Sequence, residues 1–175
     1  MKAIQFYTIK SSGGLKVEIS NLGAKITKLL VSNRKGEVKD VVLGFKTADE
    51  WRTQETYFNA ICGRVANRIK GGVFSLQNSA ANSQPIEYHL PINNGPNSLH
   101  GGLEGFNAKI WDVTAQSAYE ITLHYRSKDG EEGLILNTAV PARALGSQRT
   151  VRPSCRPKAS STRRPFLCAS TSKSL

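Results

Sequence analysis

Cysteine is scarce in this chain of 175 residues, which contains only Cys62, Cys155 and Cys168. Three widely spaced cysteines without a CxxC pair indicate neither a disulfide framework nor a zinc ribbon. Long hydrophobic runs are also absent. No segment approaches the ~18 apolar residues of a membrane span, and the opening MKAIQFYTIK lacks the apolar run of a signal peptide. We therefore expect a soluble, cytoplasmic protein without a membrane partner.

Nucleotide-binding and metal-binding motifs are missing as well. The glycine-containing stretch 63–72 lacks the Lys-Ser/Thr ending of a phosphate loop, and no dinucleotide fingerprint is present. The three histidines form no cluster with other residues at the spacing of metal ligands. The sequence thus predicts neither a cofactor nor a metal site.

Acidic residues are absent after Glu132. Residues 1–133 contain 16 Lys and Arg and all 13 acids, whereas residues 134–175 contain eight basic residues and no acid. The latter segment is rich in Ser, Thr, Pro, Ala and Arg, and Phe166 is its only aromatic residue. Such a composition predicts disorder, because little apolar surface is available to offset the ordering entropy. Its charge favours salt-sensitive contacts with nucleic acid, but the lack of stacking aromatics argues against a specific nucleic-acid partner.

Alternating apolar and polar residues dominate the first 133 positions. This period is typical of half-buried strands, and Gly and Asn turn signals separate the segments. The expected strands cover 15–20, 26–31, 41–45, 73–76, 86–92, 109–114 and 119–126. A helical turn is expected only over Thr47–Thr53. Short strands at regular spacing predict an all-β fold, either a sandwich or a barrel.

Two segments carry side chains suited to a polar ligand. In GRVANRI, residues 63–69, Asn67 adjoins Arg68, and a guanidinium beside an amide suits a ligand covered with hydroxyl groups. Arg64, four residues before Arg68, is expected near the same face. A solvated arginine is the alternative interpretation.

The second segment is PNSLHGG, residues 96–102, where His100 lies in a loop of small residues. The flanking glycines allow a ligand to approach the backbone, and the imidazole could donate to a ligand oxygen or act as a general acid. An ordinary turn is the alternative.

His89 and His124 lie within expected strands, where a structural role is favoured. Glu131 and Glu132 are adjacent in a turn and are poor candidates for a cooperating acid and base.

Several ordered motifs resemble the aldose 1-epimerase family, also called galactose mutarotases. They are NLGAKITKLLV, VVLGF, GRVANRI, PNSLHGG with the following GFNAKIW, and SKDGEEG. The resemblance covers roughly residues 3–133, with an insertion around 78–84. It implies an all-β fold that is part of a large β-sandwich, here incomplete. Uncovered strand edges in such a fold predict self-association.

The resemblance also implies a function without a cofactor. The family interconverts the α and β anomers of hexoses such as galactose and glucose, so a hexose is the expected partner. Asn67, Arg68 and His100 match the family's sugar-binding residues. The family's proton donor, a downstream His in an Asn-His-Ser type segment, and its Glu base near the C-terminus have no counterpart in this sequence, so the catalytic residues stay unknown.

The expected organisation is an N-terminal epimerase-like part, 1–133, followed by a basic tail, 134–175. The tail is either disordered or the product of a shifted reading frame after Gly133. The chain is therefore expected to be a weak or inactive epimerase. The alternative is a non-catalytic carbohydrate-binding or vestigial protein.

Overall fold

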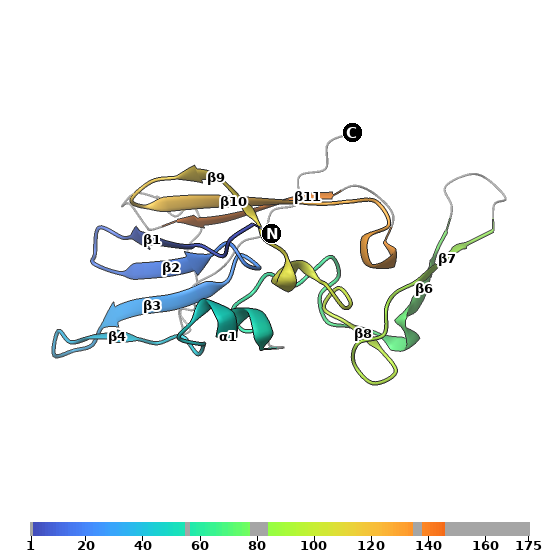
Figure 1. Cartoon of the computed structure of the whole chain (residues 1–175), viewed down its shortest axis with the longest axis horizontal. Helices are drawn as coiled ribbons and strands as arrows, with labels where there is room; N and C mark the ends of the chain where they lie inside the picture. The colour runs from blue at the N-terminus through green and yellow to red at the C-terminus, as the bar shows by residue number, and fades with distance from the viewer. Residues whose placement is uncertain (1, 55–56, 78–83, 135–137, 146–175) are drawn as a thin grey trace, which may run out of the picture.

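A computed structural model describes residues 2–54, 57–77, 84–134 and 138–145. Two antiparallel sheets and two short two-stranded pairs account for its regular structure (Figure 1). The all-β prediction is confirmed. In the described ranges no helix has the length and hydropathy needed to cross a membrane.

The first sheet has the order β1-β2-β3-β4. Its strands are β1 (Phe6–Lys10), β2 (Lys16–Ser20), β3 (Ile26–Ser32) and β4 (Val38–Asp40). Each strand pairs with the next along the chain through a short connection. Sequence alternation predicted β2 and β3 within a residue or two, but β1 was not predicted.

The second sheet has the order β11-β10-β9 and lies over the first sheet (Figure 1). Its strands are β9 (Asp112–Gln116), β10 (Glu120–Ser127) and β11 (Thr138–Leu145). The Lys10 backbone N–H donates to the Ala118 carbonyl at 2.7 Å and joins the two layers at one end.

The hydrophobic core lies between these sheets. Both layers contribute its buried members, which are Ile9, Ile19, Ala24, Phe106, Trp111, Ile121, Leu123 and Ala142. Three aromatic rings pack at its centre: Trp111 lies 6.0 Å from Phe106 and 5.7 Å from Tyr125, between ring centroids. Successive side chains of a strand point to opposite faces of the sheet. The apolar residues of the alternating sequence pattern therefore face inward and form this core.

Smaller elements extend from the sandwich. They are α1 (Ala48–Thr53), β5 (Arg68–Ile69), β6 (Val73–Leu76), β7 (Ile86–His89) and β8 (Ser98–Leu99), with 3-10 turns at Lys70–Gly72, Phe106–Ala108 and Glu131–Gly133. The β6–β7 hairpin projects away from the two sheets (Figure 1). The helical turn predicted over Thr47–Thr53 is confirmed by α1. It begins at a reciprocal capping box between Thr47 and Glu50.

The strand predicted over Val41–Phe45 is wrong. Pairing with β3 occupies Val38–Asp40 instead, and the Asp40 carboxylate accepts hydrogen bonds from the backbone N–H groups of Leu29 and Val42. The Asp40 carboxylate thus accepts a hydrogen bond that a backbone carbonyl would accept in a continued strand, and β4 ends there. Within the VVLGF motif, Gly44 packs against α1: a Cβ on Gly44 would lie 2.4 Å from the Trp51 indole.

Regular structure continues past the boundary predicted after Gly133, and the division of the chain into two parts stays a prediction. Strand β11 lies beyond it and pairs with β10 over eight residue pairs, from Ser127–Thr138 to Glu120–Leu145. Composition suggested disorder because the segment is short of large apolar residues, but a strand needs only backbone partners and small side chains such as Ala142, which is buried. The predicted disorder or frame shift over 146–175 falls outside the described residues.

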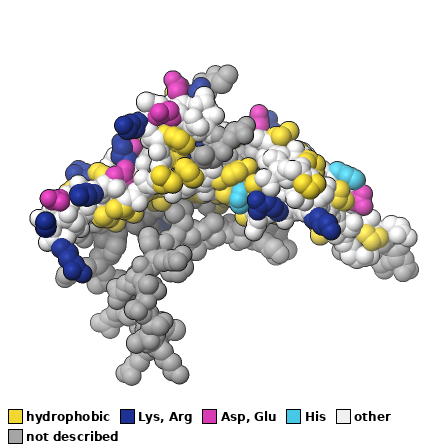
Figure 2. Space-filling model, turned by 90° about the horizontal axis from the view of Figure 1, so that it is seen from below, with side chains coloured by type: hydrophobic (Ala, Val, Ile, Leu, Met, Phe, Trp, Pro, Cys, Tyr) yellow, Lys and Arg dark blue, Asp and Glu magenta, His cyan; other side chains and the backbone are white. Residues whose placement is uncertain are grey.

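Several large hydrophobic side chains remain on the surface. Val38, Val41, Leu43, Leu76 and Leu103 are each more than half exposed. Figure 2 shows hydrophobic side chains across the middle of one face, with Lys and Arg side chains gathered at its left end and along its lower edge right of centre. Self-association stays a prediction.

Candidate functional site

The two predicted ligand-binding segments lie against each other. β5 pairs with β8, so that Arg68 is opposite Leu99. The His100 backbone N–H donates to the Asn67 carbonyl, and the Asn67 backbone N–H donates to His100 Nδ1, both at 3.0 Å. Because Nδ1 accepts this bond, the proton of the uncharged ring is on Nε2, which can donate to a ligand. The structure therefore brings together Asn67, Arg68 and His100.

Arg68 is exposed and is oriented by amide side chains. Asn67, at φ +66°, accepts the Arg68 backbone N–H through Oδ1 at 2.9 Å. The Arg68 Nε donates to Asn94 Oδ1, also at 2.9 Å. Within the described ranges this leaves the two terminal nitrogens of the guanidinium able to donate to a ligand.

Tyr57 and Asn93 support His100, although sequence patterns did not single them out. The Tyr57 and His100 ring centroids are 4.6 Å apart. Asn93 donates to the carbonyls of Leu99 and Gly102 and accepts the Leu99 N–H at 2.7 Å. One amide thus fixes the loop on both sides of His100. The Asn93–Asn94–Gly95 run signalled only a turn, so these contacts could not be inferred from it.

A polar cleft of about 470 Å³ opens beside this group. Its lining residues are Leu22, Lys25, Trp51, Arg52, Gln54, Tyr57, Asn93, Asn94, Leu99, Leu103, Asn107 and Ala108. Tyr57 and Asn94 join it to the site, since they contact His100 and Arg68 respectively. Clefts of this volume accommodate small-molecule ligands.

The glycines of PNSLHGG pack against protein atoms. A Cβ on Gly101, at φ +96°, would lie 1.7 Å from the Gly63 carbonyl oxygen, and one on Gly102 would lie 2.1 Å from Glu132 Oε2. PNSLHGG therefore needs glycine at position 101 so that its backbone can meet the backbone of GRVANRI. The expectation that these glycines admit a ligand is replaced by this packing role.

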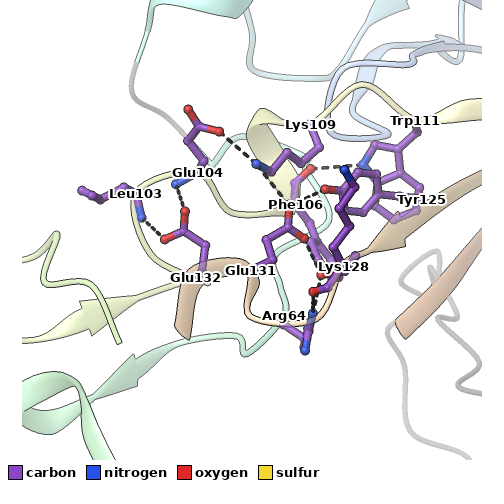
Figure 3. A network of polar contacts seen from close by, with 11 residues as sticks. Arg64, Leu103, Glu104, Phe106, Lys109, Trp111, Tyr125, Lys128, Glu131 and Glu132 are labelled. Atoms are coloured by element: carbon purple, nitrogen blue, oxygen red, sulfur yellow. Dashed lines mark hydrogen bonds and ion pairs between the residues drawn. The ribbon is translucent and has the colours of Figure 1, made fainter. Parts of the chain in front are cut away.

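Arg64 does not share a face with Arg68. Its guanidinium donates to the Ser127 hydroxyl at 2.6 Å and to the Lys128 carbonyl (Figure 3). It also donates to the Leu134 carbonyl at 3.2 Å. It therefore ties the segment before Asn67 to the end of β10. The sequence spacing failed because residues 64–68 follow neither a strand nor a helix, with Asn67 in the left-handed region.

Glu131 and Glu132 contact different partners, as Figure 3 shows. Glu132 accepts the backbone N–H groups of Leu103 and Glu104, at 2.9 and 3.1 Å, and so holds the loop that follows His100. Glu131 accepts from the Tyr125 hydroxyl at 2.5 Å and from Ser127. Because Glu131 and Glu132 bind different groups, they do not form a cooperating acid and base.

The Glu131 environment changes the pKa values of its neighbours. Burial raises the pKa of Glu131, but hydrogen bonds from Ser127, Tyr125 and Lys109 outweigh this and lower it overall. Burial and the adjacent Glu131 carboxylate raise the pKa of Tyr125. Lys109 lies 3.3 Å from Glu131, and although burial opposes its charge, its pKa is raised by hydrogen bonds to Glu104 and Glu131.

We expect Glu131 to make stability depend on acid pH. Because its folded-state pKa lies below the ordinary 4.5, its contribution is complete above that value and is lost as the pH falls through the folded-state pKa. Glu131→Gln should lower the free energy of unfolding by about 1–3 kcal/mol at pH 7 and flatten its fall below pH ~4.5. Urea unfolding between pH 3 and 7 measures both effects. The exposed Glu87→Gln variant is the control, and an unchanged acid slope in Glu131→Gln would contradict the assignment.

The described residues contain no group of three or more His, Cys, Asp or Glu side chains arranged to hold a metal ion. The site as described consists of amide, guanidinium, imidazole and phenol groups. Such groups make directional hydrogen bonds to hydroxyl oxygens.

Comparison with known proteins places these features in a family. The family model described as aldose 1-epimerase matches residues 5–143. The galactose mutarotase of Sus scrofa is 46% identical over 122 residues, covering 70% of this chain and 33% of the relative. The Homo sapiens galactose mutarotase is 43% identical over 119 residues, covering 68% of this chain and 32% of the relative.

Solved structures agree with this fold. An aldose epimerase homologue from C. elegans superimposes with a TM-score of 0.73 at 29% identity, covering 82% of this chain and 42% of that one. A galactose 1-epimerase from Lactobacillus acidophilus gives a TM-score of 0.62 at 21% identity and shows the fold alone, covering 82% and 44%. The chain spans about a third of the length of the curated relatives it matches. With a family match across most of its length and an incomplete β-sandwich of the galactose mutarotase type, the chain belongs to the aldose 1-epimerase family.

Proposed function

We propose that this chain binds a hexose such as galactose or glucose through Asn67, Arg68 and His100. The observation that carries the proposal is the reciprocal pair of hydrogen bonds between Asn67 and His100. It fixes the imidazole with Nε2 available as a donor and places it next to the residue that precedes Arg68. Guanidinium, amide and imidazole donors in one place suit the several hydroxyl oxygens of a sugar.

We further propose that the chain alone is a weak or inactive aldose 1-epimerase. Interconversion of anomers needs one group to remove the anomeric hydroxyl proton and another to protonate the ring oxygen, each typically contributing about 10²–10⁴ in rate. Glu131 and Glu132 are engaged by protein donors away from such a role. No acid follows Glu132 in the sequence. The function best supported is therefore sugar binding with little turnover.

The test compares binding with turnover. Isothermal titration with galactose should give saturable binding that Arg68→Ala weakens at least about tenfold, because charge-assisted hydrogen bonds are lost. Polarimetry with fresh α-glucose should show mutarotation close to the buffer rate. Arg126→Ala, which removes an exposed arginine of β10, is the matched control.

Two results would overturn the proposal. Absence of galactose binding, or binding indifferent to Arg68→Ala, would reject the sugar site. Turnover well above the buffer rate would reject the claim of weak activity and show that other groups supply the acid and base.

We also propose a cytoplasmic location. Cys62 is a free, half-buried thiol whose pKa is raised by burial, so it is neither paired nor activated. Widely spaced cysteines fit a reducing compartment.

A further inference from the structure

Lys25 is a buried lysine at the edge of the cleft. It follows the turn after β2, and only 3% of its surface is exposed. Its Nζ donates to the Trp51 carbonyl at 3.3 Å and lies 5.7 Å from the centroid of the Trp51 indole. No carboxylate pairs with it in the part of the chain that the structure describes. The ammonium therefore has one carbonyl acceptor and one aromatic face.

The cleft that Lys25 lines has a cationic and amide character. Arg52 lies on the same lining, together with the amides of Gln54 and Asn107. Among the residues that the structure describes, the lining contains no Asp or Glu side chain. Two cations without a carboxylate among these residues favour a positive potential in the cleft, which a low-dielectric wall such as Trp51 strengthens.

Burying the Lys25 ammonium costs folding free energy. Withdrawing a charged amine from water without an anionic partner is unfavourable, and burial accordingly lowers the pKa of Lys25. A carbonyl and an aromatic face compensate only part of this loss. An anion entering the cleft would supply an opposite charge, and two opposite charges attract each other more strongly at low dielectric than in water.

We propose that Lys25, assisted by Arg52, recognises an anionic group on the ligand of this cleft. The cleft adjoins the Arg68 and His100 site through Asn94 and Tyr57, so one ligand can contact both. This inference rests on the proposed hexose binding and narrows its substrate class to a hexose carrying a carboxylate or a phosphate.

The experiment compares four probes on the full chain by isothermal titration at low salt. Galactose tests the sugar site, inorganic phosphate tests the anion site, and galacturonate and galactose 6-phosphate combine both and distinguish the two sources of charge. We expect at least one anionic sugar to bind about tenfold or more tightly than galactose, the effect of one charge-assisted contact. The preference should weaken in 0.5 M NaCl.

Variants test whether Lys25 causes the tighter binding of anionic sugars. Lys25→Met retains the apolar stem that packs on Trp51 and should reduce the ratio of anionic to neutral sugar affinity to about one. Lys25→Arg should keep most of the ratio, and Arg52→Gln should lower it less than Lys25→Met. Thermal unfolding by circular dichroism verifies that each variant is folded, and the wild-type comparison does not depend on any variant.

The outcomes separate this inference from the proposed function. Equal affinities for galactose and both anionic sugars, or a preference that persists in Lys25→Met, would overturn the anion site while galactose binding upholds the sugar site. Phosphate binding that Lys25→Met abolishes, without any galactose binding, would uphold the anion site and reject the sugar site.

Discussion

Replacing Gly101 by alanine is expected to separate the two loops that carry Asn67 and His100. The residue has φ +96°, and a Cβ there would lie 1.7 Å from the Gly63 carbonyl oxygen and 2.8 Å from the Arg64 nitrogen. These are backbone atoms, which cannot move aside as a flexible side chain does. The left-handed conformation costs about 1–2 kcal/mol by itself, and relief of the overlap requires the loops to move apart.

We expect Gly101→Ala to reduce the free energy of unfolding by about 3 kcal/mol or more, a size typical of backbone strain combined with a steric clash. The midpoint of thermal unfolding should fall by roughly 10 °C. Galactose binding should be lost in protein that remains folded, because the bond from the Asn67 N–H to His100 Nδ1 would break. Thermal unfolding and titration at 15 °C measure the two effects separately.

Gly14→Ala is the matched control. Gly14 has a similar φ of +86° but no atom within 4 Å of its added Cβ. Its substitution should cost only the roughly 1–2 kcal/mol of the left-handed conformation and leave galactose binding intact. Equal destabilisation by the two variants would show that conformation alone matters and that the contact with Gly63 does not hold the site together.

Replacing Trp111 by alanine should cause a second large loss of stability. Trp111 is 1% exposed, its Nε1 donates to the Phe106 carbonyl at 3.1 Å, and its backbone N–H donates to the Asn21 carbonyl. It therefore fills the space between the sheets and joins the segment before β9 to the first layer. Truncating a buried tryptophan costs about 3–5 kcal/mol, from lost burial and from the cavity left behind.

Urea unfolding followed by far-ultraviolet circular dichroism measures this loss without depending on tryptophan emission. Trp111→Phe should retain part of the ring packing with Tyr125 and lose less. The control is Tyr119→Ala, since Tyr119 is 41% exposed and its removal should stay within about 0.5 kcal/mol. A Trp111→Ala variant as stable as this control would refute the central position of Trp111 in the core.

Alternation along the chain was sufficient to predict β2, β3 and β10 to within a few residues, because each has one inward face. It failed where other interactions decide the ends of strands. Asp40 ends β4 with its side chain, which no hydrophobic period records. Strand β11 pairs through its backbone with β10, and composition after Gly133 therefore concealed it.

The candidate site shows the same division. Asn67, Arg68 and His100 were identifiable because their motifs are local and ordered along the chain. The sequence did not reveal that Asn93 and Glu132 hold the His100 loop. Their bonds go to backbone groups of residues distant along the chain or around a turn, and backbone partners leave no trace in residue type.

By itself the sequence indicated an all-β member of the aldose 1-epimerase family, and it predicted three polar residues for ligand binding. Only the tertiary structure decided that these residues meet, that Arg64 does not share a face with Arg68, and that Lys25 is buried at a cleft whose described lining has no acidic side chain. The physical reason is the distance along the chain over which each kind of information acts. Periodicity and motifs reflect neighbours within a few residues, whereas contact between Gly63 and Gly101, and the burial of Lys25 beside Trp51, depend on how distant segments pack.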